Sequence, residues 1–434
     1  MNYISFIFQN PWREGKFNFN AIEREILPDI LKDINSSAIT VITGGRQVGK
    51  TTILMNIIDN LLKKGVEPKS VFYFNLDDFN LHPYFEQYTD FIQFINSEYQ
   101  GFKYIFIDEI QRLKNPGIFL KLISDLKLKL KIIVSGSSSL ELKSKISEHL
   151  TGRKHTFEIY PFSFGEFLKA KGVDILDKKT PGELIKFHNE ELLKFLIEFI
   201  VYGGYPKVIL SKDKKDKIIE LKEIYDSYVK KDVKDFLNVD NISGYNNLVK
   251  GLAFQIGNLI NYNELSVYSG LNVRSVKKYI DYLEGTYIFK RVFPYFTNAR
   301  KEVSKVPKIF AIDTGLMNYV RENLLNKTDI SGELYENFVF GEFLKNGFEL
   351  KFWRKGGGAE VDFVINGIPI EVKSSKLKKP SLTKSFISYI ENYKPQKAYY
   401  LNLNLYGSRI FKETEILFYP LWLIPELVKS LFKS

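Results

Sequence analysis

The sequence contains no cysteine among its 434 residues. Disulfide bonds, thiolate catalysis and cysteine-based zinc or iron–sulfur sites are therefore excluded, and the composition fits a reducing cytoplasm. Histidine is also scarce, because only four occur, scattered at positions 82, 149, 155 and 188 without the spacing of metal ligands. A zinc site built from histidine is therefore not expected.

Long hydrophobic runs are absent as well. No stretch of about 18 uncharged apolar residues occurs, so we expect no transmembrane helix and no membrane partner. The N-terminus lacks the basic start and the small-residue cleavage site of a signal peptide. Lys and Arg outnumber Asp and Glu by 62 to 51, a formal net charge of +11. This balance suits a polyanionic partner such as DNA, although AT-rich genomes also produce lysine-rich proteins of any function.

A phosphate-binding loop is the clearest motif. The β-branched run at 39–43 is typical of a strand buried in a parallel sheet, and it leads into G-x-x-x-x-G-K-T and then a helical pattern. In such a loop, backbone N–H groups surround phosphate oxygens at a helix N-terminus. Lys50 would neutralise the β- and γ-phosphates of ATP, and Thr51 would hold Mg²⁺. The residues expected to contact the nucleotide are Gly44, Gly45, Arg46, Gln47, Val48, Gly49, Lys50, Thr51 and Thr52.

A second buried strand is expected at 104–107, and it ends in two acidic residues. Asp108, at the carboxyl end of this strand, would bind Mg²⁺ directly or through water. Glu109 is placed to orient or deprotonate the attacking water, which makes it the candidate catalytic base.

A third run at 131–134 leads into serines, of which Ser137 or Ser135 is the candidate sensor of the γ-phosphate. The equally weighted alternative is a turn in which serine caps the next helix. Arg153 is a permanent planar cation that can stabilise charge on a transferring phosphoryl group. If Arg153 acts on a neighbouring subunit, the protein must form a homo-oligomer.

The middle of the chain predicts a helix–turn–helix over 262–283. In its second helix, Val276, Ile280 and Leu283 form an apolar stripe. The alternative to DNA binding is a small helical module that contacts proteins. The residues expected to bind DNA lie largely on the other faces of this helix: Arg274, Ser275, Lys277 and Lys278.

A β-hairpin is predicted around Asn366-Gly367, because this dipeptide separates two alternating runs. A two-residue turn would place Asp362 opposite Glu371, with Lys373 two residues on. Opposed side chains have Cβ atoms about 4.5–5.5 Å apart, so two carboxylates there require a cation. The alternative is an exposed hairpin face that carries ordinary surface charges.

Seven segments, taken in order, resemble the AAA+-type P-loop ATPases of archaea and bacteria with a C-terminal domain of unknown function and a nuclease-like core. One departure is Gly45, where such proteins often have proline. The resemblance implies an α/β fold with an ATPase core at 1–160, a helical lid at 161–240, a winged-helix module at 241–322 and a restriction-endonuclease-like domain at 323–434. The matching segments are Gly44–Thr51, 107–111, 134–137, 150–153, 160–167, 202–206 and 309–316.

The hairpin itself is similar to the PD-(D/E)XK nucleases. This similarity implies that Asp362, Glu371 and the carbonyl that follows Glu371 hold Mg²⁺ or Mn²⁺, while Lys373 orients or activates water for attack on a phosphodiester. Such folds often add a glutamate from a preceding helix, and here Glu336 matches best, with Glu342 second.

These features predict a cytoplasmic, ATP-dependent DNA-processing enzyme in which ATP hydrolysis accompanies metal-dependent DNA cleavage, for example of branched or junction DNA. One alternative is a nucleotide-switched, DNA-binding regulatory ATPase whose nuclease-like domain does not cut. Another is an ATP-driven switch for protein partners.

Overall fold

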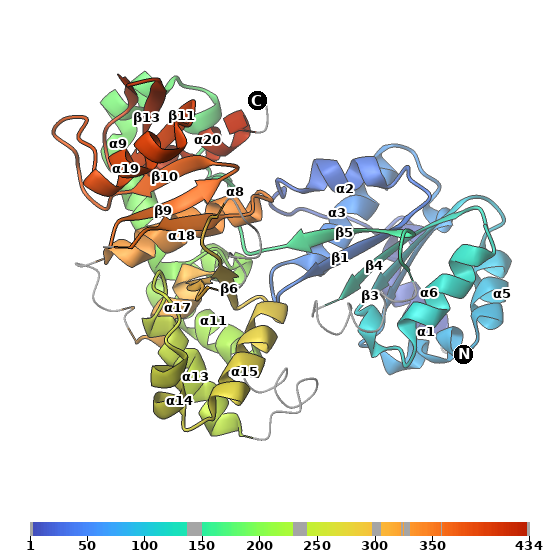
Figure 1. Ribbon diagram of the computed structural model, residues 1–434. Coiled ribbons are helices and arrows are strands. Elements are labelled where there is room, and N and C mark those ends of the chain that lie inside the picture. The colour runs from blue at the N-terminus through green and yellow to red at the C-terminus, as the bar shows by residue number, and fades with distance from the viewer. Residues whose placement is uncertain are drawn as a thin grey trace. The chain divides into compact units, whose positions relative to one another are not determined.

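The computed structural model of the protein describes residues 3–136, 150–228, 241–296, 305–322, 324, 330–356 and 358–431. The chain divides into two compact units. The first comprises residues 1–160 and the short segment 285–287, and the second comprises residues 161–284 and 288–434 (Figure 1). Within the described ranges, no helix is both long and apolar enough to cross a membrane.

A five-stranded parallel sheet forms the centre of the first unit, in the order β2-β3-β4-β1-β5. Its inner strands are nearly continuous runs of buried residues, as expected where both faces of a parallel sheet are covered. Because β4 lies between β1 and β3, the carboxyl ends of these three strands meet at one edge. The strands are β1 (Ile39–Gly44), β2 (Val71–Asn75), β3 (Lys103–Asp108), β4 (Leu130–Gly136) and β5 (Lys154–Ile159).

The helices of this unit pack on the sheet through a core rich in aromatic rings. Phe6 stacks on Phe74 with ring centroids 5.5 Å apart and meets Phe94 edge-on at 5.1 Å. Such pairs each contribute about 0.5–1.5 kcal/mol beyond the burial of their area. The helices are α1 (Tyr3–Gln9), α2 (Leu27–Asp33), α3 (Lys50–Lys63), α4 (Pro83–Glu86), α5 (Tyr88–Glu98) and α6 (Pro116–Asp125), with short 3-10 helices η1 (Pro11–Glu14), η2 (Pro68–Ser70), η3 (Phe79–Leu81) and η4 (Ile110–Arg112).

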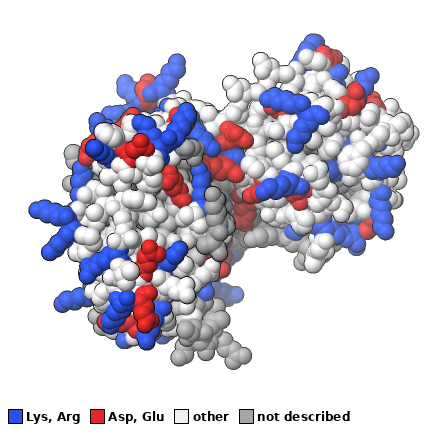
Figure 2. Space-filling model, turned by 90° about the horizontal axis from the view of Figure 1, so that it is seen from above, with Lys and Arg blue, Asp and Glu red and all other residues white. Residues whose placement is uncertain are grey.

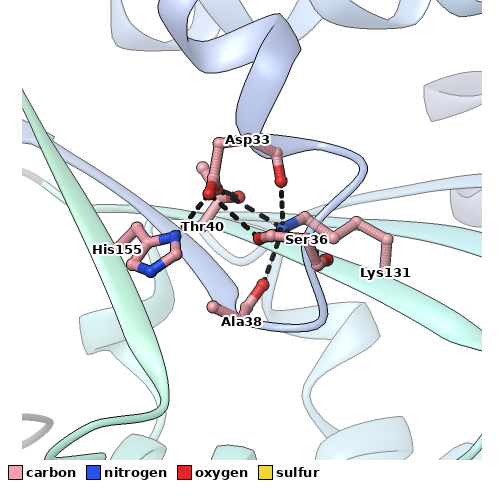
Figure 3. Close-up of polar contacts among 6 residues, drawn as sticks. All are labelled: Asp33, Ser36, Ala38, Thr40, Lys131 and His155. Atoms are coloured by element: carbon pink, nitrogen blue, oxygen red, sulfur yellow. Dashed lines mark hydrogen bonds and ion pairs between the residues drawn. The ribbon is translucent and has the colours of Figure 1, made fainter.

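A buried lysine fixes the connection from α2 to β1 (Figure 3). The ammonium of Lys131, on β4, donates to the carbonyl oxygens of Asp33, Ser36 and Ala38 at 2.9, 3.2 and 2.6 Å. Its side chain is only 2% exposed. A buried ammonium is tolerated only where partners compensate its lost hydration, and these carbonyls supply that compensation.

The carboxylate beside this lysine is equally well satisfied. Asp33 accepts hydrogen bonds from the hydroxyls of Thr40 and Ser36, contacts the ring of His155, and lies 3.4 Å from the ammonium of Lys131. Burial alone would raise the pKa of Asp33, yet these hydrogen bonds and the lysine lower it to about 2. The cluster is therefore a structural clamp at the start of β1, at the other end of the strand from the predicted phosphate loop.

Helices make up the first half of the second unit. Asp313 joins two of the glycine-containing segments, because its carboxylate accepts from the backbone N–H of Gly204 at 2.7 Å and of Leu316 at 2.9 Å. A Cβ on Gly315 would lie 2.0 Å from the carbonyl oxygen of Tyr202, so only glycine fits there. The helices are α8 (Phe164–Ala170), η5 (Ile175–Asp177), α9 (Pro181–Tyr202), α10 (Pro206–Leu210), α11 (Lys214–Asp226), α13 (Ile242–Phe254), α14 (Tyr262–Ser269), α15 (Val273–Gly285) and α17 (Thr314–Val320).

Two strands follow α15 and form an antiparallel pair, β6 (Phe289–Val292) and β7 (Lys308–Ala311). In the preceding helix pair, α14 ends at Gly270 in the left-handed conformation, with φ +69°. The apolar stripe predicted on α15 is confirmed, since Val276, Ile280 and Leu283 are all buried. A helix–turn–helix therefore precedes this small sheet.

A six-stranded mixed sheet, in the order β12-β13-β11-β10-β9-β8, forms the rest of the second unit. The turn predicted at Asn366 and Gly367 is present, with φ of +49° and +84° as a two-residue hairpin turn requires. The elements are α18 (Gly332–Lys345), β8 (Lys351–Arg354), β9 (Glu360–Ile365), β10 (Ile368–Val372), α19 (Lys384–Tyr393), β11 (Lys397–Asn402), β12 (Gly407–Phe411), β13 (Thr414–Pro420), η7 (Leu421–Leu423) and α20 (Ile424–Leu431). The predicted ladder is confirmed for three pairs: Ile365 with Ile368, Val364 with Pro369 and Phe363 with Ile370.

Candidate functional site: a phosphate loop and a buried carboxylate cluster

The loop between β1 and α3 has the backbone geometry of a phosphate cradle. Gly49 precedes α3 with φ +95°, and Gln47 is also left-handed with φ +58°. A Cβ on Gly44 would lie 2.2 Å from the carbonyl oxygen of Ile159, so no larger residue fits where β1 passes β5. The loop therefore depends on glycine for close backbone approach as well as for its turn.

Lys50 and Thr51 begin α3 and point in different directions. The ammonium of Lys50 donates to the carbonyl oxygens of Gly44 at 3.2 Å and Gly45 at 2.7 Å, which holds it over the loop. The hydroxyl of Thr51 donates to the carboxylate of Asp108 at 2.6 Å. The structure thus brings the loop and the acidic strand end together, as Mg²⁺ bound between them would require.

Asp108 is the centre of a small hydrogen-bond network. Its Oδ2 accepts from the hydroxyl of Tyr73 at 2.9 Å as well as from Thr51, and its Oδ1 accepts from the hydroxyl of Ser135. Burial, followed by the charge of Asp108, raises the pKa of Tyr73, so this phenol stays a donor. Ser135 also lies 3.3 Å from the backbone N–H of Glu109. The network fixes the Asp108 carboxylate from the two neighbouring strands, β2 and β4, and from the first turn of α3.

Glu109 follows Asp108 in a left-handed conformation with φ +56°. Burial raises the pKa of Glu109, and the charge of Lys50 partly offsets this effect. A carboxyl with a raised pKa is suited to proton exchange with water. Its Oε2 accepts a hydrogen bond from the side chain of Gln111.

The remaining predicted residues of this site lie at the surface, along the loop or outside the described residues. The guanidinium of Arg153 pairs with Asp125 at the surface, and Ser137 lies outside the described residues. Along the loop, Gly45 and Val48 are buried, whereas Arg46, Gln47 and Thr52 are partly exposed.

The second candidate site lies on the hairpin β9–β10, where the ladder departs from the predicted register. Asp362 and Glu371 do not form a ladder pair. Instead, the carboxylate of Asp362 accepts the backbone N–H of Val372 at 2.7 Å. The reason is a bulge, because β8 advances two residues from Lys351 to Trp353 while β9 advances three between their partners. A bulge bends its strand and re-aims the side chains.

Glu371 is almost fully buried, with 3% of its surface exposed, which the alternative of an exposed charged face does not explain, whereas Asp362 and Lys373 are partly exposed. Its Oε1 accepts from the ammonium of Lys373 at 2.8 Å and from the hydroxyl of Thr383 at 3.0 Å. Its Oε2 is buried with no hydrogen-bond partner. Burial and the neighbouring charge of Asp362 raise the pKa of Glu371 to about 7.

Glu336, on α18, completes the cluster. Burial, and then the charge of Asp362, raises the pKa of Glu336 to about 8. Burial also raises the pKa of Asp362. The second candidate, Glu342, is used elsewhere, since it accepts the backbone N–H of Phe164 at 2.9 Å and pairs with Lys345 at 3.3 Å. The charge of Asp362 therefore acts on two other carboxyls, the buried Glu371 and the partly exposed Glu336.

The residues present fit a divalent cation. Crowded carboxylates and the orphaned oxygen of Glu371 are what a bound cation would satisfy. In the described ranges, no three Asp, Glu, His or Cys side chains are grouped closely enough to form a metal site alone. Mg²⁺ commonly takes only one or two carboxylates and completes its shell with other oxygens, which Asp362, Glu371 and the Val372 carbonyl can provide.

Three family models match consecutive parts of the chain: an AAA domain at 36–168, a domain of unknown function (DUF8612) at 193–329 and another (DUF4143) at 331–423. An uncharacterized Methanocaldococcus jannaschii protein is 31% identical over 360 residues, which cover 80% of this chain and 74% of that protein. The chain belongs to the family of this archaeal protein. An uncharacterized Haemophilus influenzae protein is 28% identical over 79% of this chain and 83% of its own length.

Solved structures with a similar arrangement include the Aeropyrum pernix ORC2 protein in its ADP form (11% identity, TM-score 0.34, 65% of this chain and 91% of that one). AMPPCP-bound DnaA from Aquifex aeolicus has 19% identity and a TM-score of 0.29 over 64% of this chain and 92% of that one. The AAA domain match and the order of the parallel sheet identify the first unit as an AAA+-type P-loop ATPase domain, which binds nucleotide.

The residues predicted to bind DNA lie on α15. Arg274, Lys277 and Lys278 are exposed, while the backbone N–H of Ser275 donates to the side chain of Asn272 at 2.8 Å. Lys277 and Lys278 also lie over tyrosine rings, at 5.2 and 5.4 Å from the ring centroids. On the face drawn in Figure 2, Lys and Arg are spread among acidic residues and form no continuous basic stripe.

Sequence reasoning missed three residues at the two sites. Tyr73 lies inside a buried strand whose apolar neighbours give no sign of a polar role. Arg24 precedes α2, and its guanidinium donates to the carbonyl oxygens of Val48 at 2.9 Å and Tyr160 at 2.7 Å, which ties the loop to the end of β5. Thr383 caps α19 and also reaches Glu371; only its place before a helix was visible in the sequence.

Proposed function

We propose that this protein is an ATP-driven DNA-processing enzyme. Its active site for phosphodiester cleavage would be formed by Asp362, Glu371 and Lys373. The observation that carries the proposal is the buried, unpartnered carboxylate oxygen of Glu371 beside Asp362 and Lys373. Burying carboxylates without full compensation is costly, and a catalytic cation site is a reason to keep them.

In the ATPase unit, Lys50 would release its loop carbonyls to contact the β- and γ-phosphates. Thr51 and Asp108 would hold Mg²⁺, and Glu109 would orient and deprotonate the attacking water. The γ-phosphate sensor would be Ser135, which stands at the end of β4 beside Asp108, or Ser137. Arg153 would stabilise charge on the transferring phosphoryl group, and if it does so in a neighbouring subunit, the protein must form an oligomer.

In the second unit, Asp362, Glu371 and the Val372 carbonyl would hold Mg²⁺, or Mn²⁺ in its place. The bound cation supplies Lewis acidity and a more acidic water. Lys373 would orient that water, since burial alone would lower its pKa but Glu371 raises it and keeps the ammonium charged. Glu336 would hold a second water by hydrogen bonding.

DNA would contact α15 through Arg274, Lys277 and Lys278, with the pair β6–β7 as the wing of a winged helix. Arg and Lys at such positions bind phosphates, so contacts from this helix would position the duplex. ATP hydrolysis would change the conformation of the ATPase unit and so regulate cleavage.

The test is cleavage of linear and branched DNA with Mg²⁺ and ATP. We expect Asp362→Asn and Lys373→Met each to lower the cleavage rate by about 100-fold or more while ATP hydrolysis persists. Lys378→Met is the matched control, because Lys378 is an exposed lysine five residues further on and should keep full activity. Salt-sensitive DNA binding without cleavage by the wild type would instead support a regulatory, non-cutting ATPase.

A further inference from the structure

The strand β7 lies over the face of β9 and contacts it at two alternate positions. Lys308 pairs with the carboxylate of Glu360, and two residues later the ring of Phe310 lies 5.3 Å from that of Phe363. Phe310 also stacks on Phe340 of α18 at 4.9 Å. Because side chains two apart on a strand share a face, Lys308 and Phe310 both point toward β9 and α18.

Asp362 lies between these two contacts. Glu360 and Phe363 face β7, whereas Val361 and Val364 pack in the hydrophobic cluster that includes Phe386 of α19. The bulge explains how two residues three apart can share one face of the strand. The charges of both residues of this ion pair act on the Asp362 carboxyl: that of Lys308 lowers its pKa and that of Glu360 raises it.

Glu336 approaches the same place from α18. A Cβ on Gly257 would lie 3.6 Å from the Oε2 of Glu336, and the backbone N–H of Gly257 donates to the carbonyl of Ile309 at 2.8 Å. Because Gly257 is hydrogen-bonded to Ile309, the residue that follows Lys308, the Glu336 carboxyl lies close to this end of β7. The charge of Lys308 also lowers the pKa of both Glu336 and Asp362 against the effect of burial.

Lys308 is itself deeply buried, with 3% of its surface exposed. Its ammonium lies 5.5 Å from the centroid of the Phe352 ring. Lysine is almost never this buried unless its charge is compensated, and here the compensating groups belong to the carboxylate cluster. Lys308 is thus a fixed internal cation of the candidate metal site.

Counting charges gives the consequence. The four carboxylates Glu336, Glu360, Asp362 and Glu371 carry four negative charges when ionised. Lys308, Lys373 and the exposed Arg354, which lies 3.8 Å from Glu360, carry three positive charges, which leaves one negative charge. We infer that Lys308 takes the place of a second metal ion, so that this site accepts a single divalent cation. The inference rests on the proposed metal site. Lys308 is a positioning residue in it, because it holds Glu360 away from the cation.

The test counts the Mn²⁺ ions that bind to the full-length, nucleotide-free protein. Free Mn²⁺ is measured by electron paramagnetic resonance, and the number of ions bound by Asp362→Asn is subtracted from the number bound by each other variant. We expect one Asp362-dependent ion in the wild type and two in Lys308→Met, since removing the ammonium adds one negative charge and leaves Glu360 with only the exposed Arg354, 3.8 Å away. Lys308→Arg keeps the charge and should bind one. Lys305→Met is the matched control, because Lys305 is exposed and should also leave one ion.

Two Asp362-dependent ions in the wild type would overturn the inference while leaving the proposed nuclease intact. The same holds if Lys308→Met, folded by circular dichroism, binds one ion or none while the wild type binds one. If the wild type binds no Asp362-dependent ion, the metal site and the proposed cleavage fail together. If Lys308→Met does not fold, the number of Asp362-dependent ions in the wild type still tests the inference: one ion supports it and two ions overturn it.

Discussion

Tyr73 offers the sharpest test of the ATPase site, because its hydroxyl is the side-chain donor that β2 provides to the Asp108 carboxylate. The Tyr73→Phe substitution removes the donor that lies 2.9 Å from Oδ2 of Asp108 and keeps the buried ring. Tyr73 is only 4% exposed, so water has little access to replace the lost hydroxyl. In the proposed mechanism, Thr51 leaves Asp108 to bind Mg²⁺, after which the hydroxyls of Tyr73 and Ser135 and the backbone N–H of Glu109 would hold the carboxylate.

A hydrogen bond to a charged group contributes about 1.5–3 kcal/mol, and each 1.4 kcal/mol corresponds to about tenfold. We therefore expect kcat/KM for ATP to fall by about 10- to 100-fold, with a higher Mg²⁺ concentration needed for half-maximal rate. Burial and Asp108 raise the pKa of Tyr73, so the phenol stays protonated and the effect should be the same between about pH 7 and pH 9.

The assay is steady-state ATP hydrolysis over a Mg²⁺ titration. Tyr104→Phe is the matched control, because Tyr104 lies on the neighbouring strand β3, where it is partly exposed and makes an edge-on contact with Phe102. It should leave both parameters unchanged. Equal Mg²⁺ dependence and equal rates for Tyr73→Phe and wild type would refute the assignment of Asp108 as a Mg²⁺ ligand positioned by Tyr73.

Three predictions concern stability. Lys131→Met should cost about 3 kcal/mol, because it leaves Asp33 and its carbonyls without their buried cation, and should lower the melting temperature of the ATPase unit by about 6–12 °C in calorimetry. The pKa of Asp33 is lowered to about 2 from 3.8, so its contribution is present above pH 4 and should disappear between pH 4 and 2 in acid titrations followed by circular dichroism. Gly315→Ala should prevent stable folding of the second unit, since its Cβ would meet the Tyr202 carbonyl at 2.0 Å, whereas Gly182→Ala, with open space around it, should be tolerated in the same thermal melts.

Features that depend on neighbouring residues in the chain were predictable. The phosphate loop is specified by Gly44, Gly49 and Lys50, whose roles follow from backbone conformation and charge alone. The hairpin at Asn366-Gly367 is specified in the same way, and the period of 2 along each strand then fixed three ladder pairs correctly.

Features that depend on residues far away in the chain could not be predicted from the sequence. Tyr73 and Lys308 sit in apolar strands, and only the fold shows that each one meets a carboxylate from elsewhere in the chain. The choice between Glu336 and Glu342 likewise depends on which way α18 faces the sheet, and an almost uniformly buried helix carries no periodic signal for that.

The bulge at Asp362 shows why a correct motif can still give a wrong local geometry. Strict alternation predicts Asp362 directly opposite Glu371, but one extra residue in β9 ends the ladder at Phe363 and Ile370. The carboxylate of Asp362 then occupies the hydrogen-bonding position that a ladder carbonyl would have taken opposite Val372. This exchange explains how an acid can be held at a strand end without an unpaired backbone N–H. Glu360 of the same strand pairs with Lys308 of β7, so the charge balance of the site depends on a strand that precedes the hairpin motif by about 50 residues.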